Sequence, residues 1–372
     1  MTGTKKFLFV SLILLATLYL VAWSKGVLVI SPGPNARIAE AARSLCLHGT
    51  LQAPEFLTIR NDALKSSADT HTVVWQDAFA VGKRGELLPK HSLFSILGAA
   101  LCYKLFGEGG FLVFQFISVT TLLFALSSIL ASLTPSDTSA SLAITLFILT
   151  QSIFYFFAFN YDLQGTALLV LGLYLARSFP LTGGLVLGLS VFVRPAYLIF
   201  AAPFACAWNL SPLNIRKIAL TAAGVAAVLG VFLLVNWQWF GAPFTSAYQH
   251  IEYFRDGKPF MAEHPIGFTW DTFAADWEQK LFAPKRGLLL WNPVLLLLPF
   301  ALPSIFRSPF CSFFSAVLLG AALYFLYIFS YPMWNNTEYG NRFLLPSITL
   351  CALPVALWLA ELLGKRGDLK PN

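Results

Sequence analysis

Apolar segments long enough to cross a membrane recur along the chain and are separated by polar stretches. The first covers residues 7–23, follows two lysines, and is long enough to span a bilayer core. It could also be a secretory signal, but no small-residue cleavage site follows it and more apolar segments come later, so we expect an uncleaved first helix. The later segments are 110–133, 139–157, 163–176, 181–208, 218–239, 288–306, 310–331 and 343–363. Each is predicted to be a helix, because a backbone in lipid must satisfy its polar groups within its own segment.

One apolar segment, 181–208, is interrupted in its middle by Arg194 and Pro195. The proline removes a helix donor, and an arginine in mid-membrane costs about 2.5–3.5 kcal/mol. Two half-helices that meet near Arg194 solve both problems. Just before the break, Gly184 and Gly188 are spaced for close packing against a neighbouring helix, which is a structural role.

The basic residues predict how the chain is oriented in the membrane. With the N-terminal lysines in the cytoplasm, six later basic residues also fall on the cytoplasmic side: Arg177, Arg216, Lys217, Arg307, Lys365 and Arg366. This arrangement gives about ten transmembrane crossings with both termini in the cytoplasm. Three polar segments, 24–109, 240–287 and 332–342, then lie on the outer face, and chemistry is expected there.

The composition agrees with a polytopic membrane protein. Hydrophobic residues make up 57% of the chain and charged residues only 12%, against about 25% charged residues in soluble domains. We therefore predict one all-α membrane domain over residues 1–372. The net charge of +7 suits anionic lipids or phosphate groups, and the lack of a basic stripe with interleaved aromatics argues against nucleic acid.

The sequence encodes no strong metal or redox site. The five cysteines lack CxxC or Cys/His spacing, so neither zinc binding nor disulfide exchange is indicated. Cys46 and Cys102 share the first outer segment and either pair or remain small unpaired residues. Acidic residues alone could hold a divalent cation, but no ligand spacing requires one.

The long outer segment 24–109 contains predicted surface elements. Residues 35–48 have strong helix propensity and are followed by Gly49, which is typical of a helix end. Residues 72–86 alternate and turn at 82–85, which suggests a hairpin. The apolar part of 87–107 covers about 14 residues, too few for a crossing, and predicts a second helix lying on the membrane.

Several short motifs follow one another in a recognisable order. A lysine stands in Pro89-Lys90-His91-Ser92-Leu93, ahead of a surface helix that ends in Leu-Phe-Gly. Three further stretches are Phe157-Ala158-Phe159-Asn160-Tyr161-Asp162, Lys285-Arg286-Gly287-Leu288 followed by Asn292-Pro293, and Tyr339-Gly340-Asn341-Arg342-Phe343-Leu344-Leu345-Pro346. In this order and on one side of the membrane, they resemble the GT-C superfamily of membrane glycosyltransferases, in particular the family 39 and aminoarabinose-transferase-like group.

The resemblance implies transfer of a sugar from a polyprenyl-phosphate donor to a lipid, glycan or protein acceptor. The expected location is the outer face of a bacterial inner membrane, with membrane lipids as further partners. The alternative is a protein of the same fold that binds or transports polyprenyl-phosphate lipids without catalysis. One difference from the family motif favours this alternative: Pro34 and Asn35 stand where the family carries its principal aspartate.

The leaving lipid phosphate needs positive charge more than a proton donor. Lys90, Arg194 and Arg342 are the candidate phosphate ligands, with His91, Tyr339 and Asn35 as further substrate-binding candidates. Each cation also has a structural alternative. Lys90 could be an interfacial lysine, Arg342 could pair with Glu338, and Arg194 needs a partner at membrane depth, for which Asp162 is the natural candidate.

A base for the acceptor hydroxyl has two candidates. Asp162 is expected at the outer end of a helix where the family has a second functional acid, and an N-cap is its structural alternative. Glu40 is the second choice, and a pair with Arg37 or Arg43 is its structural alternative. In 240–287, aromatics including Tyr248 and Trp270 are expected to cover the site or to anchor at the interface.

Overall fold

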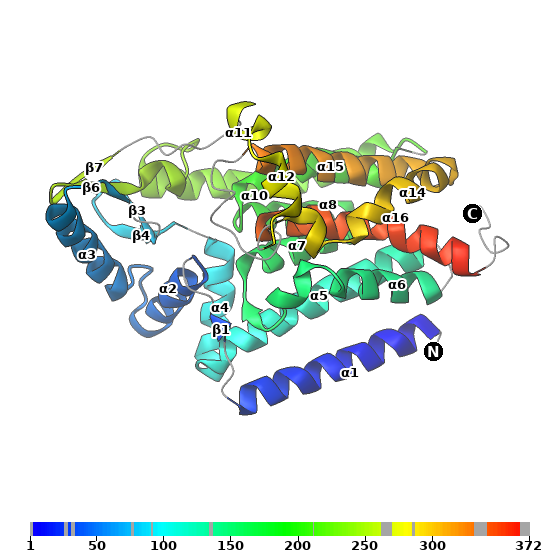
Figure 1. The fold of residues 1–372 in the computed structure, drawn as a ribbon, viewed down its shortest axis with the longest axis horizontal. Coiled ribbons are helices and arrows are strands. Elements are labelled where there is room, and N and C mark those ends of the chain that lie inside the picture. Colours follow the sequence, from blue (N-terminus) through cyan, green and yellow to red (C-terminus); the bar gives the residue numbers. More distant parts are fainter. Residues whose placement is uncertain are drawn as a thin grey trace.

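The computed structural model describes residues 3–25, 29–30, 34–75, 78–90, 92–133, 137–210, 212–261, 270–284, 287–330 and 341–364. Long helices lie side by side along the long axis of the molecule (Figure 1). They are α1 (Gly3–Ser24), α5 (Gly109–Leu133), α6 (Asp137–Ile148), α7 (Tyr161–Ala176), α8 (Pro180–Val191), α10 (Ile215–Phe240), α14 (Val294–Arg307), α15 (Cys311–Phe329) and α16 (Leu345–Gly364); the short helix α9 (Ala201–Ala207) follows the break after α8. The predicted all-α polytopic class is confirmed, with a few short strands in addition.

Within the described residues, four helices are long and apolar enough to cross a membrane, namely α5, α10, α15 and the segment Arg342–Leu363 that contains α16. Shorter apolar helices complete the bundle of an integral membrane protein. The segment with α16 is the core of the bundle, with 89% of its apolar window buried, whereas only 17% of the α10 window is buried. Most of the α10 surface is therefore available to lipid or to a lipid-like ligand.

The predicted break in 181–208 is confirmed. Helix α8 ends at Val191, and the 3-10 helix η2 (Pro195–Phe200) begins directly after Arg194, which has an extended backbone. Proline is favourable at the first position of a helix because its missing donor is not needed there. The break thus places the arginine side chain between two half-helices.

The close packing expected of the glycines is also present. A Cβ atom on Gly184 of α8 would overlap the backbone carbonyl of Thr221 on α10. A Cβ atom on Gly224 of α10 would overlap the Leu181 carbonyl in return. Helices α8 and α10 therefore touch backbone to backbone, as small residues allow.

The prediction of one helix over 139–157 is wrong. Helix α6 ends at Ile148 and is followed by the 3-10 helix η1 (Gln151–Tyr155). The hydroxyl groups of Thr150 and Ser152 both donate hydrogen bonds to the carbonyl of Phe147. Such local side-chain bonds compete with the helical backbone pattern and favour its termination.

Segment 24–109 contains the two predicted surface helices, α2 (Pro34–His48) and α4 (Leu93–Phe106). An additional helix, α3 (Pro54–Thr70), was not predicted, and its Asp62 and Asp69 are exposed. The cysteines at 46 and 102 are free thiols.

The predicted hairpin turns at the expected place, but its strands differ. Strand β3 (Phe79–Val81) pairs antiparallel with β4 (Leu87–Pro89), which lies beyond the predicted hairpin. Strand β2 (Val74–Trp75) pairs instead with β6 (Glu252–Arg255), and β6 pairs with β7 (Lys258–Met261). Helix α3 and this small sheet lie at the end of the molecule opposite both chain termini (Figure 1).

Candidate functional site

Asp162 lies in the first turn of α7, where the chain enters the helical bundle. The two-stranded pairing of β1 (Val29–Ile30) with β5 (Ala158–Phe159) fixes the preceding segment. The Asn160 side chain caps α7 by accepting a hydrogen bond from the Leu163 amide at 3.1 Å. The N-cap alternative for Asp162 is therefore wrong, and its carboxylate is available for other contacts.

Arg194 is the main partner of this carboxylate. Its Nη2 and Nε donate to Asp162 Oδ1 at 2.6 and 3.1 Å, and both side chains are buried. Nη2 also donates to the Tyr161 hydroxyl at 3.0 Å, and the guanidinium lies 4.2 Å from the Phe343 ring centroid. The pairing predicted for Arg194 is confirmed, and it satisfies an arginine that would otherwise be costly at this depth.

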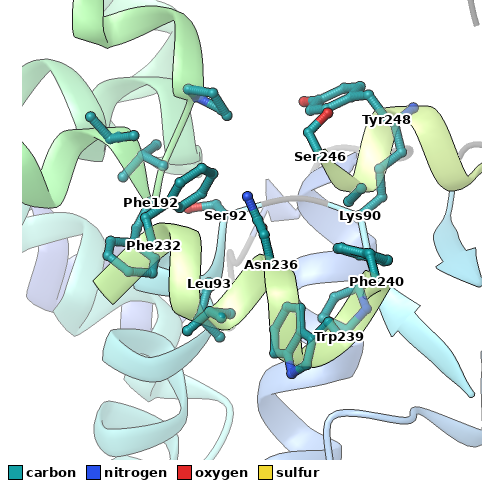
Figure 2. Close-up of a pocket in the computed structure, with 16 residues that line it drawn as sticks. Lys90, Ser92, Leu93, Phe192, Phe232, Asn236, Trp239, Phe240, Ser246 and Tyr248 are labelled. Atoms are coloured by element: carbon teal, nitrogen blue, oxygen red, sulfur yellow. The ribbon is translucent and has the colours of Figure 1, made fainter. Parts of the chain in front are cut away.

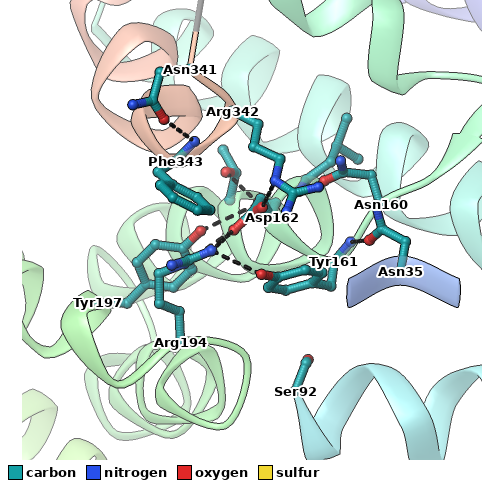
Figure 3. A network of polar contacts seen from close by, with 12 residues as sticks. Asn35, Ser92, Asn160, Tyr161, Asp162, Arg194, Tyr197, Asn341, Arg342 and Phe343 are labelled. Carbon is teal, nitrogen blue, oxygen red and sulfur yellow. Dashed lines mark hydrogen bonds and ion pairs between the residues drawn. The ribbon is translucent and has the colours of Figure 1, made fainter. Parts of the chain in front are cut away.

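Arg342 approaches the same carboxylate from the start of the last helix (Figure 3). It opens the 3-10 helix η5 (Arg342–Leu344), and its Nε lies 3.4 Å from Asp162 Oδ2. Neither atom of this ion pair forms a hydrogen bond to another described residue. Two guanidinium groups thus share one carboxylate, so the cluster Asp162–Arg194–Arg342 carries excess positive charge.

Asn35 lies next to this cluster. Its side chain is fully buried, and its Oδ1 accepts a hydrogen bond from the Tyr161 amide at 3.3 Å (Figure 3). Its Nδ2 has no partner among the described residues. The position where the family carries an aspartate therefore holds an amide that supports the N-terminus of α7.

Lys90 lines a separate cavity of about 50 Å³ between α10, the α8–η2 break and the end of β4 (Figure 2). Its Nζ lies 4.8 Å from the ring centroid of Tyr248, which belongs to the 3-10 helix η3 (Ala247–His250). The lining is mostly apolar: Pro89, Leu93, Val191, Phe192, Val193, Pro195, Phe232, Val235, Trp239, Phe240 and Ala247. Ser92, Asn236, Ser246 and Tyr248 add polar groups, so Lys90 is the charged member of the described lining.

The cavity and the cluster meet at the helix break. Val193 and Pro195 line the cavity, and the residue between them, Arg194, points its side chain to Asp162. Burial, together with the nearby charge of Arg194, lowers the pKa of the Lys90 ammonium to about 7. An anion in the cavity would relieve this repulsion.

The described contacts do not bring the other predicted site residues to the Asp162 cluster or to the Lys90 cavity. Glu40 is bonded to Arg37 at 2.7 and 2.9 Å, which is the structural alternative offered by the sequence. His91 and Tyr339 lie outside the described residues, as do Glu338, Lys285 and Arg286. Within the described ranges, no group of three or more His, Cys, Asp or Glu side chains is arranged to hold a metal ion.

Two aromatic residues have larger roles than their sequence signals suggested. Tyr161 receives Arg194 on its hydroxyl and lies beneath Arg342, 5.8 Å from the guanidinium carbon to the ring centroid. Tyr248 covers the Lys90 ammonium. Tyr161 belongs to the motif at 157–162, but a tyrosine next to an aspartate has no spacing that indicates a role in a site. Tyr248 was one of several loop aromatics.

The architecture defines a polytopic helical membrane protein with a cationic cluster beside an apolar cavity. No model of a known protein family matches the sequence, and no curated protein does either. Among solved structures, ArnT from Cupriavidus metallidurans is similar in the apo state, with a TM-score of 0.53 and 13% identity. The same protein bound to undecaprenyl phosphate gives a TM-score of 0.51 and 11% identity.

Each match covers 93% of this chain and 59% of the ArnT chain, so the chain spans about three fifths of the length of that protein. ArnT is a GT-C glycosyltransferase. The fold of this chain is similar to the fold of ArnT, and this similarity confirms the predicted resemblance at the level of fold.

Proposed function

We propose that this chain is an integral membrane glycosyltransferase that moves a sugar from a polyprenyl-phosphate donor to an acceptor hydroxyl on the outer face of a bacterial inner membrane. One observation carries the proposal: a cavity with an apolar wall from α10 ends at a buried lysine beside a cluster with excess positive charge. The apolar wall suits an isoprenoid chain, and the lysine with the cationic cluster suits a phosphate. The similarity in fold to a protein that binds undecaprenyl phosphate supports the same ligand.

In this reaction the acceptor oxygen forms a bond to the anomeric carbon, and the bond from that carbon to the phosphate oxygen breaks. The polyprenyl phosphate leaves with the electron pair, and the hydroxyl proton passes to a base. Because the leaving phosphate gains a negative charge, cations next to it stabilise the transition state more than the bound donor. Lys90, Arg194 and Arg342 would supply this charge, with Asn35 supporting the frame.

Asp162 is the proposed base, with Glu40 as second choice. In the structure Oδ1 accepts from Arg194, and Oδ2 faces Arg342 without a hydrogen bond. A donor phosphate that draws Arg342 away would leave Oδ2 ready to accept a proton. The base would then become available only when donor is bound.

The test is reconstitution of the purified chain with labelled polyprenyl-phosphate sugars and extracted envelope glycolipids. Transfer by the parent, with loss in Lys90→Ala and in a folded Asp162→Asn variant, is expected. Transfer that is unchanged in both variants, or absent from the parent across the common donors, would overturn the catalytic proposal as stated.

The second candidate is a protein of this fold that binds or transports a polyprenyl-phosphate lipid without transferring a sugar. Two observations favour it: Asn35 stands in place of the family aspartate, and the Asp162 carboxylate is occupied by arginine. Saturable binding of undecaprenyl phosphate that depends on Lys90, with no turnover of any sugar-linked donor, would support this candidate instead.

A further inference from the structure

A second hollow lies further along the β3–β4 hairpin from the Lys90 cavity. Its volume is about 440 Å³, within the range of small-molecule sites. It lies between the start of α3, the hairpin and the first residue of β6. Neither the Asp162 cluster nor the phosphate cations line it.

The two hollows share the same two polypeptide segments. Leu87 of β4 lines the second hollow, while Pro89 of the same strand and the adjoining Lys90 line the first. In an extended strand these positions are roughly 7 Å apart along the backbone. On the other segment, Tyr248 lines the first hollow and Glu252 the second. A ligand in one hollow is therefore a near neighbour of a ligand in the other.

The polar groups of the second hollow suit hydroxyl groups. Arg60 Nε and Nη2 donate to the two carboxylate oxygens of Glu252 at 2.7 and 2.8 Å. The third nitrogen, Nη1, has no hydrogen-bond partner among the described residues, and the Arg60 side chain is 30% exposed. Gln52, whose backbone is bonded to Ser44 and Thr50, places an exposed side-chain amide in the same lining.

Apolar groups complete the lining. Leu57 is 55% exposed, and Val81 and Leu87 are partly exposed on the hairpin. A carbohydrate presents hydroxyl edges and an apolar ring face, so it needs both kinds of surface at once. The guanidinium–carboxylate pair can still donate one hydrogen bond and accept others. It can therefore donate to one hydroxyl of a sugar and accept from the neighbouring hydroxyl.

We propose that the hollow lined by Gln52, Leu57, Arg60 and Glu252 binds the glycan portion of the acceptor, and holds it beside the donor cavity. This inference rests on the proposed transferase function and adds to it the chemical class of the acceptor. The acceptor hydroxyl would reach the reacting sugar along the β3–β4 hairpin.

The test separates acceptor binding from donor binding. The purified chain is applied to a panel of immobilised hexose, N-acetylhexosamine and heptose oligosaccharides, both neutral and acidic, and undecaprenyl phosphate binding is measured on the same samples. Leu57→Trp fills the hollow from an exposed position and keeps both members of the ion pair. The matched control is Leu47→Trp, because Leu47 on α2 is 62% exposed and lines neither hollow.

Leu57→Trp is expected to weaken glycan binding by about tenfold or more, a loss that overfilling of a site can produce, while undecaprenyl phosphate binding stays at the parental level. The double variant Arg60→Met, Glu252→Met removes both charges together and should give the same loss without stranding a buried charge. A parent that binds no glycan on the panel, or glycan binding that survives in both variants, would overturn the acceptor site. Failure of undecaprenyl phosphate binding in the parent would overturn the proposed function instead.

Discussion

The Asp162 cluster and the Lys90 cavity lie side by side, yet they differ in the groups that surround their charges. In the cluster, three distant segments meet, and one carboxylate is in contact with two guanidinium groups at 2.6 and 3.4 Å. In the cavity, one ammonium is surrounded mainly by apolar side chains, with an aromatic ring over it at 4.8 Å. The cluster is a network of ion pairs within the protein, whereas the cavity combines one cation with an apolar wall that suits a lipid phosphate.

This difference separates stability from binding. A buried charge whose partner is removed costs free energy, so changes in the cluster should act first on folding. Lys90 lines a cavity, where its ammonium can meet a phosphate group. Changes in the cavity should therefore act first on ligand affinity.

The largest effect is expected for Asp162→Asn. The amide keeps the shape of the side chain but removes the carboxylate that the buried Arg194 and the partly buried Arg342 share. The free energy of unfolding should fall by about 3–5 kcal/mol, the cost of removing one partner of a buried ion pair. Thermal unfolding in detergent, followed by tryptophan fluorescence, measures the change.

The matched control is Asp62→Asn on α3, which removes an exposed carboxylate of the same size and should shift the unfolding temperature little. If Asp162→Asn proves as stable as the parent, the cluster is not held together by this carboxylate. A loss of transfer in such a stable variant would then be strong support for Asp162 as the base.

Part of this cluster was accessible from the sequence. An arginine next to a proline inside an apolar segment predicts both a helix break and a buried partner, and both are present. The contact of Arg342 with Asp162 was not predicted, because it depends on how α7 and α16 pack. No local pattern encodes which of several acids an arginine reaches across the bundle.

Other parts of the fold could not be predicted from the sequence, for similar reasons. Helix α3 buries Phe56, Ala63 and Ser67, a helical spacing with a single large apolar residue, so its periodic signal is weak. The pairing of β2 with β6 joins residues far apart in sequence. By contrast, α2 and α4 were predicted because propensity, end signals and an apolar run agreed within each segment.

Lys90→Ala should produce the next largest effect, on affinity and not on folding. Loss of a charge-assisted contact to phosphate corresponds to about 1.5–3 kcal/mol, or roughly tenfold to a hundredfold weaker undecaprenyl phosphate binding. The unfolding temperature should change less than in Asp162→Asn, because one cation is removed and not the carboxylate that two guanidinium groups share. Lys104→Ala, which removes an exposed lysine from α4, is the control. A large loss of stability in Lys90→Ala would remove the contrast between the two regions.

The pH dependence of binding sharpens the same contrast. Because the pKa of Lys90 is lowered from 10.5 to about 7, the ammonium is charged below pH 7 and largely neutral above it in the free protein. Affinity for undecaprenyl phosphate should therefore fall as pH rises above 7, by at most about tenfold per unit. Lys90→Arg carries a permanent charge and provides the comparison, since titration of the phosphate itself is common to both proteins. A parent and a Lys90→Arg variant with the same pH profile would show that Lys90 does not titrate on binding.

The smallest effect is expected for Tyr248→Leu, which removes the ring above the ammonium. A cation–π contact of this kind contributes about 0.5–1 kcal/mol, so undecaprenyl phosphate binding should weaken by roughly twofold to fivefold. The charged form of Lys90 would also lose support, which moves the pH midpoint of binding to a lower value. Tyr248→Phe keeps the ring and should behave like the parent in both measurements. If Tyr248→Phe instead weakens binding as much as Tyr248→Leu, the hydroxyl is the active group, and the cavity recognises phosphate through a hydrogen bond from Tyr248 in addition to the charge of Lys90.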